Sequence, residues 1–199
     1  MFHILIVLSE QNHQVNILGL TLQVRKHKKH LKDYTMTSEN LKIIPNFLEF
    51  YTFNELYNQF NSPNFPWFWT QSPGEREQYV NLLYFDHQFS SAMNPTINRC
   101  LMAATNKLGV IAILRVKLNA TCRNAPEQEW HTDWQISTPS KTCVIYLNDN
   151  DGYTEFETGE KVMSQTNTAV IFDTNLRHRG VPATNVDRRM VLNISYFEK

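Results

Sequence analysis

The sequence has few cysteines, and they do not form a recognisable pattern. Cys100, Cys122 and Cys143 are the three cysteines among 199 residues, widely spaced and without a CxxC pair. An odd number of scattered cysteines indicates neither a disulfide framework nor a zinc knuckle. We therefore expect a protein of the reducing cytoplasm.

Long apolar runs are also missing. The longest candidate membrane segment, residues 2–8, is interrupted by His3 and is far shorter than the roughly 20 residues that a membrane-spanning helix needs. It also lacks the positively charged start of a signal peptide. We expect a soluble protein with no membrane partner.

Charge of one sign is not in excess. The 19 Lys and Arg residues balance the 19 Asp and Glu residues, and 42% of residues are hydrophobic. This composition is typical of a globular protein and makes disorder or binding to nucleic acid unlikely. The length favours one domain over two. The oligomeric state does not follow from composition.

The first 35 residues differ from the rest, and we interpret residues 1–35 as an N-terminal extension, disordered or not native. A basic cluster at residues 24–32, VRKHKKHLK, favours a solvated arm over a phosphate-binding patch. Met36 is an alternative natural start. A single domain then spans residues 36–199, with helical support over about 36–108 and a jelly-roll core over about 109–199.

Helices are predicted in the first half of the chain. Mixed helical spacing of apolar residues predicts a short helix within residues 45–60. A clearer helix is predicted at residues 94–108, with Asn94 as N-cap, Pro95 at the first helical position and Gly109 after the last. Three aromatics between them, Trp67, Phe68 and Trp69, are expected to plug the space under a sheet, with a substrate groove as the alternative.

From Gly109 onward the pattern changes to that of strands. Short segments rich in β-branched and aromatic residues alternate with turn signals; they are residues 110–118, 141–147, 152–157, 168–172 and 189–197. With no helices between them, such strands favour antiparallel pairing in a sandwich or barrel. The predicted fold class is mainly β with N-terminal helices (α+β), built on a jelly roll.

His131, Asp133 and His178 are the candidate metal ligands. Side chains at i and i+2 of a strand share a face, so His131 and Asp133 can reach one ion together. His178 follows a later strand and can return to the same place in an antiparallel sheet. Two imidazoles and one carboxylate leave open positions on the ion, as in non-haem Fe(II) oxygenases.

Arg189 is the candidate anion-binding residue. It opens the last strand on a face with Val191, Asn193 and Ser195, opposite an apolar face that would pack on the helices. A guanidinium inside the barrel is costly unless it meets an anion, and its fork suits a carboxylate. The hydroxyl of Tyr146, central in the segment CVIYLN, could donate to the same carboxylate.

This ordered set of residues resembles the 2-oxoglutarate and Fe(II)-dependent oxygenases, in particular the prolyl-4-hydroxylase-like branch and its small bacteriophage-encoded members. The resemblance covers residues 42–199 and is sharpest from Leu114 onward. It implies a double-stranded β-helix, the cupin-like form of the jelly roll. If the gene is carried by a phage, the compartment would be the host cytoplasm.

The resemblance also implies roles for single residues. Its HTD motif corresponds to His131 and Asp133, and the histidine of LRHRG to His178, as ligands of Fe(II). Tyr146 and an arginine of the last strand would bind the distal carboxylate of 2-oxoglutarate. Counting back from Tyr196 and Phe197 selects Arg189, and the spacing from His178 leaves Arg188 open. Asn119 is a further candidate contact of 2-oxoglutarate, or else a strand-end residue.

The implied reaction hydroxylates a C–H bond with O₂ while 2-oxoglutarate is decarboxylated to succinate and CO₂, with ascorbate as a supporting reductant. No catalytic residue beyond the metal centre is needed. Peptidyl proline is the family-level substrate, and a small molecule remains open. Ser195 occupies the position at which nucleic-acid demethylases carry a second arginine, and this difference argues against a nucleic-acid substrate. The alternatives are a non-catalytic cupin-type jelly roll that binds a metal or small ligand, and a zinc hydrolase.

Overall fold

The computed structural model describes residues 14–17, 20–24, 36–38, 40–70 and 77–198. Within these residues the chain forms strands and helices in the following order: β1 (Gln14–Ile17), β2 (Leu20–Val24), β3 (Met36–Thr37), β4 (Lys42–Ile44), α1 (Phe50–Asn61), β5 (Phe68–Thr70), β6 (Gln78–Phe85), β7 (Gln88–Phe89), α2 (Pro95–Leu108), β8 (Val110–Cys122), β9 (Lys141–Tyr146), β10 (Tyr153–Phe156), β11 (Lys161–Met163), β12 (Thr168–Asp173), β13 (His178–Val181) and β14 (Arg188–Glu198).

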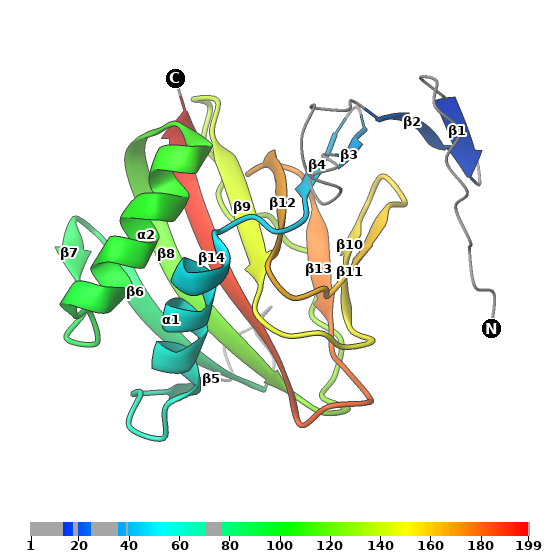
Figure 1. The fold of residues 1–199 in the computed structure, drawn as a ribbon. Coiled ribbons are helices and arrows are strands. Elements are labelled where there is room, and N and C mark those ends of the chain that lie inside the picture. The colour runs from blue at the N-terminus through cyan, green and yellow to red at the C-terminus, as the bar shows by residue number, and fades with distance from the viewer. Residues whose placement is uncertain (1–13, 18–19, 25–35, 39, 71–76, 199) are drawn as a thin grey trace.

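The described strands form two antiparallel sheets, which we call the major and the minor sheet. The major sheet has the order β1-β2-β3-β4-β12-β9-β14-β8-β6-β5, with β7 paired to β6. The minor sheet has the order β11-β10-β13. Figure 1 shows the minor sheet on one side of the major sheet and helices α1 and α2 on the other. This is the double-stranded β-helix that the family resemblance implied.

Two apolar layers hold this arrangement together. The alternate residues of β14 that were expected to face the helices do so: Met190, Leu192, Ile194 and Tyr196 are buried in one cluster with Leu56 of α1 and residues of α2. A second cluster, which includes Tyr146, Phe156, Phe172 and Val191, lies between the two sheets. Because strand side chains alternate between faces, β14 contributes to both layers.

Helix α2 begins and ends where its sequence signals place it. The Asn94 side chain accepts a hydrogen bond from the Ile97 backbone N–H at 2.9 Å, and Gly109 follows the last turn with a left-handed φ of 68°. A residue with a Cβ is strained in that conformation, whereas glycine is not. The shorter helix expected within residues 45–60 is α1, which extends to Asn61.

The segment assigned to helical support also contributes strands that we did not predict. Strand β6 pairs with β8 over most of its length, with a register shift between Leu82 and Tyr84. This irregularity interrupts the period-two alternation on which a strand prediction rests. The prediction that three aromatics pack under the sheet was correct for Trp67, which packs against the core. It was wrong for Phe68 and Trp69, which are largely exposed on β5 at the edge of the major sheet.

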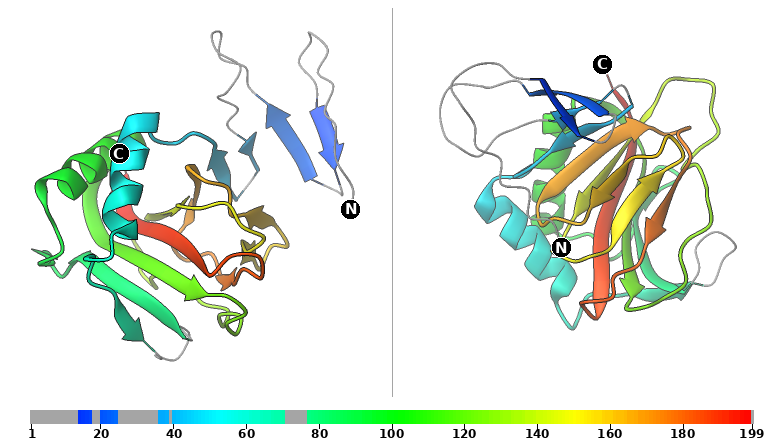
Figure 2. Two further views of the ribbon diagram at one scale, coloured as in Figure 1. Left: turned by 60° about the horizontal axis from the view of Figure 1, so that its bottom comes forward. Right: turned by 90° about the vertical axis from the view of Figure 1, so that its right-hand side faces the viewer.

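Residues 1–35, which we interpreted as an N-terminal extension, are described only in part. Strands β1 and β2 pair with each other, and β2 pairs with β3. Figures 1 and 2 show β1 and β2 to one side of the body of the molecule. Apart from Val24, the basic cluster at residues 24–32 lies outside the described residues. Among those that are described, no helix is both long and apolar enough to span a membrane.

Candidate metal and 2-oxoglutarate site

His131 and His178 are brought together by their own backbones. The two residues form an isolated antiparallel bridge, in which His131 N–H donates to His178 O at 3.0 Å and His178 N–H donates to His131 O at 2.9 Å. His178 begins β13, but His131 and Asp133 do not lie on a regular strand as expected. The bridge brings the HxD segment to His178 as a regular strand would, because it bonds this segment directly to β13.

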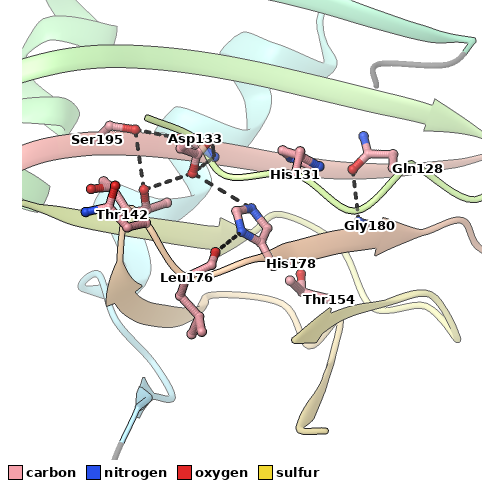
Figure 3. Close-up of polar contacts among 12 residues, drawn as sticks. Gln128, His131, Asp133, Thr142, Thr154, Leu176, His178, Gly180 and Ser195 are labelled. Atoms are coloured by element: carbon pink, nitrogen blue, oxygen red, sulfur yellow. Dashed lines mark hydrogen bonds and ion pairs between the residues drawn. The ribbon is translucent and has the colours of Figure 1, made fainter. Parts of the chain in front are cut away.

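The three predicted ligands converge on one point (Figure 3). The nearest ligand atoms of His131, Asp133 and His178 all lie within 4.8 Å of one another. His178 Nε2 is 3.8 Å from Asp133 Oδ2, and both side chains are about 95% buried, at 5% and 4% exposure. Two imidazoles and one carboxylate at this spacing are the donor set that suits a divalent transition metal such as Fe(II).

Hydrogen bonds select which imidazole nitrogen faces the site. His131 Nδ1 lies 2.8 Å from the Glu129 carbonyl oxygen, and His178 Nδ1 lies 2.9 Å from that of Leu176. A carbonyl only accepts, so Nδ1 carries the proton in both rings and Nε2 keeps a lone pair for a metal. Burial lowers the pKa of His178, which favours the neutral imidazole that a metal requires.

Asp133 is held by donors that the sequence analysis did not identify. Arg115 donates to Oδ1, Thr142 Oγ1 donates to Oδ2 at 2.8 Å, and Asn193 Nδ2 lies 3.3 Å from Oδ2. Burial by itself would raise the pKa of Asp133, but the charges of Arg115 and His178 and the Thr142 hydrogen bond outweigh it and lower the pKa. The carboxylate is therefore ionised and fixed in orientation.

A cavity of about 230 Å³ lies between the two sheets beside these ligands. The three ligands line it together with Arg189, Asn119 and further residues, among them Gln78, Arg115, Lys117, Thr121, Gln128, Thr154 and Asn193. Most lining side chains of the major sheet come from one face of β8 and β14, at alternate positions, and β6 and β9 contribute one residue each. The predicted division of β14 into a helix-facing and a cavity-facing side is confirmed.

Arg189 lies in this cavity and is 4% exposed. Its Nε donates to Ser164 Oγ at 2.8 Å and its Nη2 to Thr154 Oγ1 at 3.0 Å. Burial lowers its pKa, yet a guanidinium stays protonated in proteins. Within the described part of the chain no carboxylate forms an ion pair with Arg189, so its charge is available to an anionic ligand.

The alternative arginine points elsewhere. Arg188 is partly exposed and its Nη2 donates to Asn61 Oδ1, outside the cavity. Its neighbour Arg189 is the residue that a cavity ligand can reach, because adjacent strand residues face opposite sides. The geometry therefore selects Arg189 between the two arginines that the spacing left open.

The aromatic ring of Tyr146 packs against the guanidinium of Arg189. The guanidinium carbon of Arg189 is 5.5 Å from the centre of the Tyr146 ring. The Tyr146 hydroxyl is fully buried and lies 2.9 Å from Thr154 Oγ1 and 3.2 Å from the Val162 carbonyl oxygen. Tyr146 is not among the residues that line the cavity. Its predicted bond to a carboxylate stays a prediction. The hydroxyl that lines the cavity beside Arg189 is that of Thr154.

Asn119 lines the cavity from β8, and its Oδ1 is buried without a hydrogen-bond partner among the described residues. A buried amide without a partner is uncommon. It can be satisfied by a ligand in the cavity, which is the predicted role of Asn119, and the role itself remains untested.

Comparison with known proteins finds a likeness in structure and none in sequence. Neither models of protein families nor curated proteins match the chain. A Pseudomonas putida prolyl-4-hydroxylase is similar with a TM-score of 0.57 and 13% identity, over 80% of this chain and 93% of its own.

Two further solved structures are similar to this chain to the same degree. One is a Trichoplax adhaerens prolyl hydroxylase in complex with a peptide fragment of hypoxia inducible factor, with a TM-score of 0.58 and 15% identity over 80% of this chain and 84% of its own. Another is the epimerase SnoN in complex with Fe³⁺, α-ketoglutarate and nogalamycin RO. Its TM-score is 0.58 and its sequence identity 11%, over 80% of this chain and 79% of its own. The chain has the double-stranded β-helix fold of these oxygenases. The suggested closeness to phage-encoded members stays a prediction.

Proposed function

We propose that this protein is an Fe(II)- and 2-oxoglutarate-dependent dioxygenase that hydroxylates a C–H bond and converts 2-oxoglutarate and O₂ to succinate and CO₂. The observation that carries the proposal is a buried Arg189, which forms no ion pair with a carboxylate of the described residues, in the same cavity as His131, Asp133 and His178. A metal site alone would not require this arginine. A dicarboxylate that spans the cavity accounts for both features.

The donor set fits the metal that this reaction needs. His131 and His178 would each present Nε2 and Asp133 one carboxylate oxygen, which leaves coordination positions for a bidentate co-substrate and for O₂. Bound Fe(II) would supply the oxygen chemistry, with ascorbate as a supporting reductant. The chain would hold the metal, turn Nε2 of both imidazoles toward it and orient the carboxylate of Asp133 through Arg115, Thr142 and Asn193.

Arg189 and its neighbours would orient 2-oxoglutarate. Ser164 and Thr154 fix the Nε and Nη2 side of the guanidinium, so Nη1 and the adjoining N–H groups would receive the distal carboxylate. We propose Thr154, which bonds the Tyr146 hydroxyl, as a second donor to that carboxylate. Asn119 would contact the co-substrate at a point farther from Arg189. The walls of the two sheets would exclude water from the reacting end.

For the second substrate we propose a prolyl residue in a peptide. The support is the likeness to prolyl hydroxylases, one of which is seen with a peptide. Beside the metal ligands, Trp134 packs on Phe85, with ring centres 6.3 Å apart, and Phe85 is 45% exposed. An exposed aromatic next to the site suits contact with a peptide. A peptide library screened by mass spectrometry for the gain of one oxygen atom tests this.

The first experiment measures succinate formed from 2-oxoglutarate under air, with Fe(II) and ascorbate and without a second substrate. We expect slow uncoupled turnover by the wild type and none by His131→Ala, Asp133→Ala or His178→Ala, all still folded by circular dichroism. Turnover that survives loss of a ligand would contradict the metal site. No turnover together with no 2-oxoglutarate binding would favour a non-catalytic, metal-binding jelly roll.

A second experiment separates the two arginines. We expect Arg189→Ala to weaken 2-oxoglutarate binding to the Mn(II)-loaded protein by about 100-fold, because the loss of a charge-assisted hydrogen-bonded pair costs up to about 3 kcal/mol. Arg188→Ala is the matched control and should bind as the wild type does. Isothermal titration calorimetry measures both, and equal affinities in the two variants would refute the assignment of Arg189.

A further inference from the structure

Two glutamines join the two sheets across the cavity. The Gly180 backbone N–H of β13 donates to Gln128 Oε1 at 2.9 Å, and Gln128 Nε2 donates to Gln78 Oε1 of β6 at 3.3 Å. The Gln128 backbone N–H also donates to Gly180 O at 3.1 Å. We call the pair Gln128 and Gln78 the glutamine bridge. Figure 3 shows Gln128 above Gly180, next to the bridge of His131 and His178.

The glutamine bridge lies at the arginine end of the cavity. Gln78 pairs with Thr121 of β8, and Thr121 pairs with Arg189 of β14, so the three residues occupy one rung across the major sheet. A Cβ placed on Gly180 would lie 2.6 Å from Gln128 Oε1 and 3.5 Å from Arg189 Nη1. The carboxamide oxygen of Gln128 and the Nη1 of Arg189 therefore both lie beside Gly180.

Glycine at position 180 is what allows this closeness. Any Cβ at 2.6 Å from Gln128 Oε1 would displace the carboxamide. Gln78 is 1% exposed, so its amide is held in place on the sheet. The arrangement is thus a built wall of polar groups, with a buried side chain on one side and a backbone N–H on the other.

The spacing along β13 between the candidate ligand His178 and Gly180, which contacts this wall, is comparable to the length of a short diacid. His178 and Gly180 are two residues apart on β13, so their Cα atoms are about 6.6 Å apart along the strand. The two carboxyl carbons of 2-oxoglutarate are joined by four carbon–carbon bonds of about 1.5 Å each, which span about 5 Å. One further methylene adds about 1.3 Å and would press the distal carboxylate on the wall.

We propose that the glutamine bridge is the end wall of the co-substrate pocket and the determinant that selects a five-carbon 2-oxo diacid over its longer homologue. This inference rests on the proposed function, because it assumes that 2-oxoglutarate spans from the metal ligands to Arg189. Gln128 and Gln78 are specificity-determining residues. They act through shape and through the hydrogen bonds that hold the Gln128 carboxamide in place.

The test compares binding of 2-oxoglutarate and 2-oxoadipate, its six-carbon homologue, to the Mn(II)-loaded protein by isothermal titration calorimetry. In the wild type we expect 2-oxoglutarate to bind at least about tenfold tighter, the lower range for one misfitting methylene. In Gln128→Ala we expect this ratio to fall by about tenfold. Gln88→Ala, an exposed glutamine on β7, is the matched control and should keep the wild-type ratio.

A second variant tests whether the side chain at position 128 lies beside the distal carboxylate. In Gln128→Glu a carboxylate would stand beside Arg189 and compete with the distal carboxylate, so binding of both diacids should weaken by about tenfold or more. Thermal unfolding confirms that each variant is folded. A Gln128→Ala ratio equal to that of the wild type, with 2-oxoglutarate still bound, would overturn the end wall alone. Failure of the wild type to bind either diacid would overturn the proposed function with it.

Discussion

Asp133 is the residue on which the largest number of interactions in the site depend. It is a buried carboxylate that faces the guanidinium of Arg115, the Thr142 hydroxyl and the Asn193 amide. Arg115 in turn lies over the Trp134 ring, 5.8 Å from its centre. In the absence of a metal, Arg115 is the positive charge that offsets the charge of Asp133.

Replacement of Arg115 therefore tests this charge balance. We expect Arg115→Met to lower the free energy of unfolding of the metal-free protein by about 3–5 kcal/mol, because it leaves a buried carboxylate without its cation. Mn(II) should restore much of that loss, since the ion supplies positive charge to the same carboxylate. Urea denaturation with and without Mn(II) measures both effects.

The control is an exposed pair of the same type. Arg123 and Asp187 form a surface ion pair, with side chains 49% and 96% exposed, so Arg123→Met should cost less than about 1 kcal/mol with or without the metal. If Arg115→Met were as mild as this control, the guanidinium would not be balancing Asp133.

Single residues could be selected from the sequence only where their own pattern was informative. His131, Asp133 and His178 stand in short motifs, and Arg189 lies near the start of a strand whose two faces differ in polarity. Arg115, Thr142 and Gln128 carry no such signal. Arg115 and Thr142 are placed by their pairing with Ser195 of β14, and Gln128 by its hydrogen bond to Gly180. The register between distant strands cannot be predicted from either strand alone.

At the scale of elements, α2 is the part whose boundaries were most accurately predicted. Asn94 caps its start, Pro95 occupies its first turn and Gly109 ends it. These are local interactions within a few residues of chain, so the same signals operate before tertiary structure forms. The helix packs on the face of the major sheet that is turned away from the cavity (Figure 1).

This position predicts that the caps of α2 affect stability without affecting ligand binding. Gly109→Ala should lower the free energy of unfolding by about 1–2 kcal/mol, because alanine is strained at a left-handed φ, and Asn94→Ala by about 1 kcal/mol. Met102→Ala, at a position 56% exposed on the same helix, should change it little. A changed 2-oxoglutarate affinity in the two cap variants would show that α2 shapes the site.

Strands were harder to predict than the helix. Strands β11 and β13 span three and four residues, and β13 has the sequence HRGV, which has little β-branched or alternating character. Its pairing with β10 and its bridge to His131 make it a strand. The decisive interactions are long-range hydrogen bonds, which no local propensity reports.

For the whole molecule, the site lies where the two sheets meet. His178 belongs to the minor sheet, Arg189 belongs to the major sheet, and the HxD segment connects β8 to β9. Ligands that contact all three would link the sheets to each other. Binding should therefore stabilise the folded molecule as a unit.

We expect Mn(II) with 2-oxoglutarate at 100 times its dissociation constant to raise the free energy of unfolding by about 2.7 kcal/mol over Mn(II) alone, by mass action. In Arg189→Ala at the same concentrations the increase should be nearly absent, whereas Arg188→Ala should retain it. Differential scanning calorimetry measures the shift. Equal stabilisation of both variants would place the diacid away from Arg189.

The sequence by itself determined the mainly β character of the second half, the limits of α2, the two faces of β14 and the set of candidate ligands, because each of these depends on neighbours within a few residues. Only the tertiary structure placed Arg189, and not Arg188, in the lining of the cavity, placed Arg115 on Asp133 and built the glutamine bridge. These depend on the register of strands far apart in the chain, where burial and hydrogen bonding across the sheets select one arrangement.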